Sequence, residues 1–148
     1  QRPAVNVGLS VSRVGGAAQK PVMKKISASL RTRLAQYREL AEFMQFGSDI
    51  DDETKKALAS GRLLTEALRQ PRYAPVEDNM QAILIFAVSE GYADGISPEE
   101  MESFEKELYR YLSNEKRELA LKIKEAKKFD DELKNSLKKA LVEFAERL

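Results

Sequence analysis

The chain has 148 residues and a mass of 16.7 kDa, which is enough for one domain with a sizeable hydrophobic core. Apolar residues make up 43% and charged residues 33%, and the formal net charge is only +1, so the composition argues against a disordered chain and against nucleic-acid binding through overall charge. Cysteine and histidine are both absent, which excludes disulfides, thiol nucleophiles, histidine-based catalytic triads and zinc sites built on either residue.

The first 19 residues differ in pattern from the rest of the chain. From Ala4 to Val14, apolar side chains alternate with small or polar ones, which predicts a strand with one apolar face. A single strand cannot form a sheet, and Gly15-Gly16 ends the alternation. The chain also begins at Gln1 without an initiator methionine, so we expect a piece of a longer protein whose other strands lie on residues that this chain lacks.

From residue 20 onward, apolar side chains recur every three or four residues, which is typical of helices with one buried face. This pattern predicts an all-α fold, a helical bundle of about six helices joined by short loops. The stretch 82–88 is wholly apolar, so its helix is the best candidate for the buried middle, although seven residues are too few to span a membrane. The expected helices cover about residues 20–46, 53–69, 76–90, 97–112, 114–128 and 130–148.

Polar side chains mark where several of these helices begin. Asp51 or Asp52 is a suitable N-cap for the second helix, and Asp130 is one for the last. The segment 97–100 reads as a capping box with proline at the first helical position. The apolar stripe of the first helix is expected to continue as far as Met44.

The small net charge hides an uneven distribution. Residues 1–40 carry eight basic side chains and one acidic one, whereas residues 41–96 carry five basic and ten acidic ones and residues 97–148 are nearly balanced. A split of this kind can mark a binding face, but its ordinary interpretation is a solvated surface with compensation inside the molecule.

The short motifs in the chain do not point to a metal or phosphate site. Residues 15–20 lack the Gly-Lys-Ser/Thr ending that a phosphate loop requires. Asp49, Asp51 and Asp52 lack the glycine and the spacing of a calcium loop, so helix capping is their expected role. The five glutamates between residues 99 and 107 are expected to form a solvated helix face.

Arg13 is the most interesting single residue, because it lies between the alternating segment and two glycines. An arginine in such a place is usually a surface residue. The alternative is a phosphate ligand held on a turn, since arginine keeps its charge and offers a planar fork of donors.

The residues around Arg13 resemble a known family, and this favours the second interpretation of Arg13. Residues 2–19, which begin Arg-Pro-Ala-Val-Asn-Val-Gly-Leu-Ser-Val-Ser-Arg-Val-Gly-Gly, strongly resemble the alpha-subunit family of the rotary proton-translocating ATP synthases. The likeness continues through 34–40, 45–51, 64–66, 73–75 and 91–92, and it covers the first 95 residues closely. It implies that residues 1–19 are the C-terminal edge (strand and loop) of an otherwise missing α/β nucleotide-binding domain, and that residues 20–148 are the C-terminal helical domain.

The same resemblance implies roles for particular residues. Arg13 would be an arginine finger that reaches the catalytic site of the neighbouring beta subunit, with Ser10 and Val11 beside it. The adenine side of a non-catalytic nucleotide site on the alpha subunit would be formed by Arg2, Pro3, Gln70 and Arg72, although family members often have glutamine where this chain has Arg72. The residues expected to contact the central rotor are Gly47, Ser48, Asp49 and Asp51.

At the level of the whole complex, the resemblance implies ATP synthesis coupled to proton transport. The full-length subunit would bind ATP or ADP with magnesium, whereas the chain alone would have no cofactor and no activity as an enzyme. Its partners would be the beta and gamma subunits and other alpha copies, with no nucleic acid and no direct insertion into the membrane. The complex would lie peripherally on the cytoplasmic face of a bacterial inner membrane, or at the equivalent place in an organelle.

A second hypothesis is a free-standing helical module whose basic first helix binds nucleic acid or acidic partners. Interleaved aromatic side chains would favour it, because bases stack on them. Tyr37 is the only aromatic residue among the first 40, so the sequence gives this alternative little support.

Overall fold

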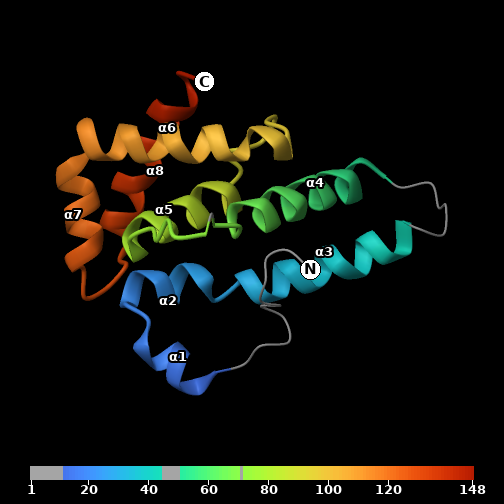
Figure 1. Cartoon of the computed structure of the whole chain (residues 1–148), viewed down its shortest axis with the longest axis horizontal. Helices are drawn as coiled ribbons and strands as arrows, with labels where there is room; N and C mark the ends of the chain where they lie inside the picture. Colours follow the sequence, from blue (N-terminus) through green and yellow to red (C-terminus); the bar gives the residue numbers. More distant parts are fainter. Residues whose placement is uncertain (1–11, 45–50, 71) are drawn as a thin grey trace.

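The computed structural model describes residues 12–44, 51–70 and 72–148. Within these ranges the chain forms eight α-helices and one short 3-10 helix (η1) and contains no strand, which confirms the all-α prediction (Figure 1). Most of the segment predicted to be extended lies outside the described residues. The elements are α1 Arg13–Ala18, α2 Pro21–Ser27, α3 Leu30–Met44, α4 Asp52–Ala67, α5 Asp78–Ser89, η1 Pro98–Glu100, α6 Met101–Asn114, α7 Arg117–Glu125 and α8 Asp131–Ala145.

Helix α5 lies in the middle of the bundle, as predicted. All seven residues of the run 82–88 are buried, so this helix has no solvent-facing side along that stretch. Helices α2 and α3 follow one side of α5 and α4, α6 lies on the other side, and α7 and α8 close one end (Figure 1). Each large apolar side chain buried in this way contributes roughly 1.5–3 kcal/mol. Helix α5 contributes more buried apolar residues than any other helix in the described ranges.

The first long helix predicted for residues 20–46 is divided in the structure. Helix α2 ends at Ser27 and α3 begins at Leu30, with a slight turn between them in which Ala28 keeps helical dihedral angles. The break has a packing cause. Helix α2 packs on α5 whereas α3 packs on α4, so the two halves follow different partners. Met44, predicted to lie on the apolar stripe, is 40% exposed.

The segment around Arg13 is also different from the prediction. Arg13 and Val14 belong to α1 rather than to the end of a strand, and Gly15 and Gly16 lie inside this helix rather than ending an element. The reason is Ser12, an N-cap whose Oγ accepts a hydrogen bond from the Gly15 amide at 2.9 Å. Helix α1 contributes no buried residue.

The predicted N-terminal signals of the later helices are confirmed. The Asp51 carboxylate accepts from the Thr54 amide at 2.7 Å and that of Asp130 accepts from the Leu133 amide at 2.9 Å. In the 97–100 capping box, the Ser97 amide donates to the Glu100 carboxylate at 2.7 Å. The predicted helix at 114–128 is shorter in the structure, since α7 ends where Ala126 turns to an extended conformation.

The basic N-terminal region is partly neutralised inside the molecule. Lys20 Nζ lies 2.9 Å from Asp78 Oδ1, and an Arg33 guanidinium nitrogen donates to the Ser89 carbonyl at 2.6 Å. These contacts tie α2 and α3 to the two ends of α5. They support the interpretation of the charge split as intramolecular compensation.

Helices α3 and α4 approach closely at Gly61, which is buried against the Tyr37 side chain. A Cβ atom at position 61 would lie 2.5 Å from Tyr37 Cβ and from its ring. Tyr37 Cβ is fixed to the α3 backbone, so only a movement of the helices relieves the clash. Gly61 therefore sets the distance between α3 and α4.

We expect Gly61→Ala to lower the free energy of unfolding by about 1–3 kcal/mol, because the overpacking outweighs the better helix propensity of alanine. Urea unfolding followed by circular dichroism measures the change. Gly16→Ala is the matched control: a Cβ there meets nothing within 4 Å, so this variant should be neutral or slightly stabilised. Equal stability of Gly61→Ala and the parent chain would contradict the packing described for α3 and α4.

Candidate functional site

Arg13 is exposed at the first position of α1. Among the described residues it forms no ion pair, so its guanidinium is available to an anion brought from outside the bundle. Helix α1 extends away from the main body beyond the start of α2 (Figure 1). The structure thus presents Arg13 on a short projecting element. Ser10 and Val11, predicted beside it, lie outside the described residues, as do Arg2 and Pro3.

The loop after α4 holds two of the predicted nucleotide-binding residues, Gln70 and Arg72, and both are exposed. Tyr73 has φ = 63°, an uncommon left-handed conformation for a residue with a side chain, and is 85% exposed. The Arg72 guanidinium lies over the Tyr73 ring, 4.7 Å from its centroid. A cation–π pair of this kind at the surface is worth about 0.5–1 kcal/mol and leaves planar faces for a ring to stack on.

Gln70 also lines a groove of about 480 Å³ between the end of α4, this loop and α6, which we call the α4–α6 groove. One wall carries Glu66 and Arg69, which form an ion pair that fixes the last turn of α4. The other wall is formed by η1 and α6 and carries Glu105 and Tyr109. A groove of this volume is in the range of small-ligand sites.

Two groups in the groove are unusually placed for their polarity. Burial raises the pKa of the Glu105 carboxyl above its usual range, and repulsion from Glu102 adds to this. Burial also raises the pKa of Tyr109 strongly, with a further contribution from the nearby Glu105 charge. Glu105 was predicted to be part of a solvated face, and that prediction is wrong, because the residue is half-buried.

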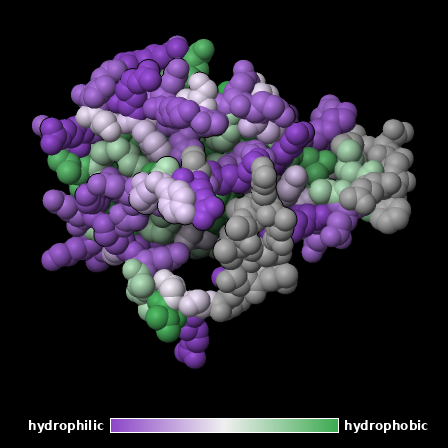
Figure 2. Space-filling model, viewed as in Figure 1, coloured by the Kyte–Doolittle hydropathy of each residue, from purple (hydrophilic) through white to green (hydrophobic). Residues whose placement is uncertain are grey.

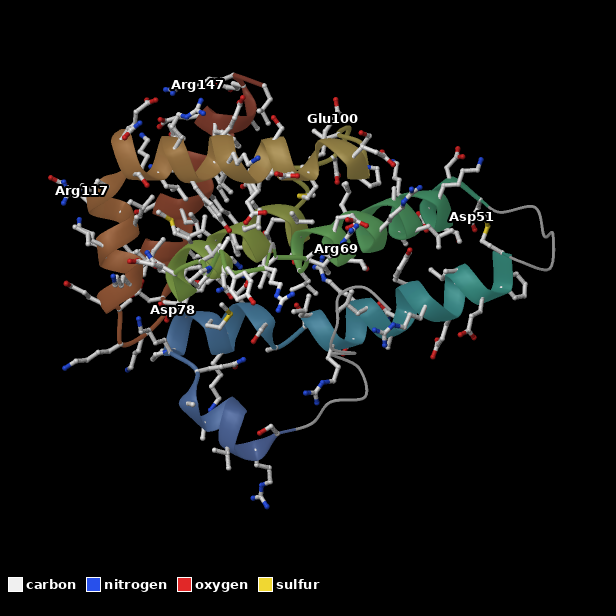
Figure 3. The ribbon with its side chains drawn as sticks, viewed as in Figure 1. Asp51, Arg69, Asp78, Glu100, Arg117 and Arg147 are labelled. Atoms are coloured by element: carbon white, nitrogen blue, oxygen red, sulfur yellow. The ribbon has the colours of Figure 1, made fainter. Side chains whose placement is uncertain are left out.

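Asp51 is the described member of the predicted rotor contact, and Gly47, Ser48 and Asp49 fall outside the described residues. Asp51 lies at the opposite end of α4 from Arg69 (Figure 3). Hydrogen bonds from Thr54, first of all from its amide, hold the pKa of the Asp51 carboxyl below its usual range. Helix α4 has 16 residues, so at about 1.5 Å per residue Asp51 and the C-terminal end of this helix are about 24 Å apart.

The predicted site residues that the structure describes therefore lie in three separate places. Gln70 and Arg72 lie on one loop, whereas Arg13 and Asp51 are each on a separate element. In the ranges that the structure describes, no group of three acidic residues is arranged to hold a metal ion, and no helix is long and apolar enough to cross a membrane. The visible face is mainly hydrophilic, with apolar side chains only in small scattered areas (Figure 2).

A family model described as "ATP synthase alpha/beta chain, C terminal domain" matches residues 19–144, which is most of the chain. The chain belongs to this family. The matched region contains the whole buried core of the described residues, from Val22 on α2 to Phe144 on α8.

Several curated proteins share almost half of the residues of this ATP synthase domain. ATP synthase subunit alpha of Petrotoga mobilis is 48% identical over 143 residues, which are 97% of this chain and 28% of the relative. The subunits alpha of Aquifex aeolicus and Clostridium kluyveri are also 48% identical, over 99% and 97% of this chain and 29% of each relative. The chain thus spans less than a third of these relatives and is similar to the C-terminal portion of the alpha subunit, as predicted.

The groove residues Glu105 and Tyr109 were not singled out from the sequence of this domain. They stand four positions apart on α6, on the boundary between its buried and exposed faces. The spacing itself was a usable signal, because residues i and i+4 lie on the same face of a helix. What the sequence does not reveal is that Gln70, Ala74 and Val76 line the same groove as these two residues.

We expect Asp51→Ala to lower the thermal stability of the domain, because the N-cap of α4 is lost. The native pKa of Asp51 is lowered, so its stabilisation is complete above the unfolded-state value of about 3.8 and disappears as the pH falls through the lower native value. Thermal melts at pH 7 and near pH 2.5 measure this: the difference between variant and parent should shrink in acid. Glu53→Ala, in the same first turn but without a capping bond, is the control and should change little.

Proposed function

We propose that this chain serves as the C-terminal domain of an ATP synthase alpha subunit, inside a multisubunit complex that couples ATP synthesis to proton transport. The observation that carries the proposal is the match to alpha subunits over nearly the whole chain at 48% identity. The exposed basic residues, the projecting α1 and the surface loop at 70–75 suit a part that works through its neighbours. The chain by itself is expected to have no ATPase activity.

In this proposal, Arg13 acts as an arginine finger in the catalytic site of a neighbouring beta subunit, with Ser10 and Val11 beside it. A guanidinium supplied in trans stabilises the charge that develops on the transferring phosphoryl group, an effect worth roughly 10³–10⁵ in rate in other nucleotide hydrolases. Its exposure, its lack of an ion pair among the described residues and its place on a projecting helix all support this role. Arginine is suited to it because it keeps its charge at any physiological pH.

The loop at 70–75 is proposed to cover the adenine of a non-catalytic ATP or ADP, bound with magnesium in the full-length subunit. Gln70 offers amide groups for hydrogen bonds, and Arg72 stacked on Tyr73 offers planar faces. Arg2 and Pro3 would complete this side of the site. Arginine in place of the common glutamine at position 72 would exchange an amide contact for a cationic one.

The acidic turn at Gly47, Ser48, Asp49 and Asp51 is proposed to contact the gamma subunit, the central rotor. Opposite charges at such a contact steer the approach and set the register more than they add affinity. The complex would be peripheral to the membrane, on the cytoplasmic side in a bacterium, and other alpha and beta copies would surround this domain. The free-standing nucleic-acid module is not favoured, since the family match covers residues 19–144 and Lys20 and Arg33 are engaged with α5.

The arginine-finger role can be tested by Arg13→Ala in a reassembled complex. We expect nucleotide binding to stay near normal while turnover falls by about 10³-fold or more, because only the transition state loses a partner. Steady-state ATPase assays and fluorescence titrations with nucleotide measure the two effects. Arg110→Ala removes another exposed arginine, on α6, and should leave both unchanged. Normal turnover of the Arg13 variant would exclude the role.

The nucleotide loop makes a separate prediction. In the same complex, Gln70→Ala should weaken binding at the non-catalytic sites by about fivefold to tenfold, the loss of roughly one hydrogen bond, and leave the catalytic rate on fresh enzyme unchanged. Counting slowly exchanging nucleotide per complex after gel filtration checks this. Gln36→Ala on α3 is the control, because that glutamine is also exposed but is not part of the loop. Full occupancy in the Gln70 variant would rule out the contact.

A further inference from the structure

The loop between α4 and α5 carries the proposed nucleotide contacts, but its own side chains do little to hold it in shape. The side chains at 72–75 are exposed, so burial does not fix them. Tyr73 has a left-handed backbone conformation, which costs free energy and persists only where the surrounding structure enforces it. The conformation of the loop therefore depends on how its two ends are attached to the bundle.

The second end of the loop is attached by Gln81 on α5. The side-chain amide nitrogen of Gln81 donates a hydrogen bond to the Val76 carbonyl at 2.6 Å. Glu77 is the N-cap of α5 and makes no side-chain capping bond, and Val76 and Gln81 stand at the N′ and N4 positions on either side of it. In many helices an apolar contact between these two positions fixes the angle at which the chain enters the helix. Here a hydrogen bond joins them, so Gln81 sets the direction of the chain between the loop and α5.

The same side chain also lies close to the first end of the loop. Gln70 and Gln81 line one small cavity of about 170 Å³, together with residues of α4, α5 and α6. Gln81 is half-buried and stands directly before the buried run 82–88 of α5. It therefore links an exposed loop to the buried central helix of the bundle.

We propose that Gln81 is a positioning residue for the non-catalytic nucleotide site: its hydrogen bond to Val76 holds the loop so that Gln70 faces the adenine. Gln81 itself does not touch the nucleotide. The inference rests on the nucleotide role proposed above for this loop. Binding residues on loops need such support, because a contact is productive only when its groups are held to within about 0.5 Å.

The test measures slowly exchanging nucleotide at the non-catalytic sites of the reassembled complex. Gln81→Met keeps the length of the side chain but has no N–H donor. We expect it to weaken binding about twofold to fivefold and to leave the catalytic rate on fresh enzyme unchanged. Gln81→Glu also lacks the donor at neutral pH and should weaken binding at least as much. Normal binding in Gln81→Met would overturn the proposal, whatever the effect of Gln81→Glu.

A double-mutant cycle separates positioning from general destabilisation. If Gln81 acts through Gln70, the double variant Gln70→Ala/Gln81→Met should bind nucleotide about as weakly as Gln70→Ala alone, because the residue to be positioned is already gone. Two losses that multiply fully would refute the positioning role. Tyr111→Phe is the matched control, since it removes a side-chain hydrogen bond to a backbone carbonyl, that of Ala140 at 3.1 Å, between α6 and α8. It should leave nucleotide binding unchanged, and a loss equal to that of Gln81→Met would also refute the proposal.

The Gln70→Ala result distinguishes this inference from the proposed function on which it rests. A clear loss of nucleotide in Gln70→Ala with none in Gln81→Met would refute the positioning role alone. Normal binding in both variants would refute the nucleotide role of the loop, and this inference with it. A loss in Gln81→Met without one in Gln70→Ala would show that Gln81 does not act through Gln70, and it would also end the proposal.

Discussion

The bundle depends on one constraint, the complete burial of the apolar run 82–88 in α5. A helix with no polar side cannot rest on a surface, and it has to be enclosed by other helices along its length. Helices α2, α4, α6 and α7 all pack on it, and the Phe86 ring meets Phe129 edge to face at 5.8 Å. The one buried polar residue of α5, Asn79, donates to the Ala120 carbonyl at 3.2 Å and so links α5 to α7.

Ion pairs then orient the surrounding helices at the two ends of α5. At its start, Lys124 pairs with Glu77 at 3.0 Å and Lys20 pairs with Asp78; at its end, Lys138 pairs with Glu90 at 2.8 Å. The hydrogen bond from Lys138 lowers the pKa of the Glu90 carboxyl, which is the sign expected for a pair formed in the native state. Pairs this exposed contribute at most about 1 kcal/mol each, so they select the helix orientation while apolar burial supplies the stability.

The sequence correctly predicted where a helix begins wherever a capping side chain marks its N-terminus. Asp51, the 97–100 capping box and Asp130 all begin helices, because a side-chain cap acts within four residues and needs no tertiary partner. The predictions that were wrong depended on contacts between residues far apart in sequence. The break between α2 and α3 follows from packing on two different helices, and half-buried Glu105 lines a groove with residues of α4 and its following loop that are far away in sequence. In the candidate site, the residues themselves could be named from the sequence. The contact of Arg72 with the Tyr73 ring could not, because it depends on the left-handed backbone conformation of Tyr73.

The hydrophobic core begins only after α1, and this affects how firmly Arg13 can be held. The first buried residue of the described chain is Val22, close to where the family match begins at residue 19, and α1 before it buries nothing. The bundle therefore does not fix the orientation of Arg13, and Val14 beside it is 81% exposed. An arginine that must reach a phosphate in another subunit has to be held to within a fraction of an ångström, because small misplacements cost much of the rate. If Arg13 takes the proposed role, that rigidity would come from contacts outside the helical bundle.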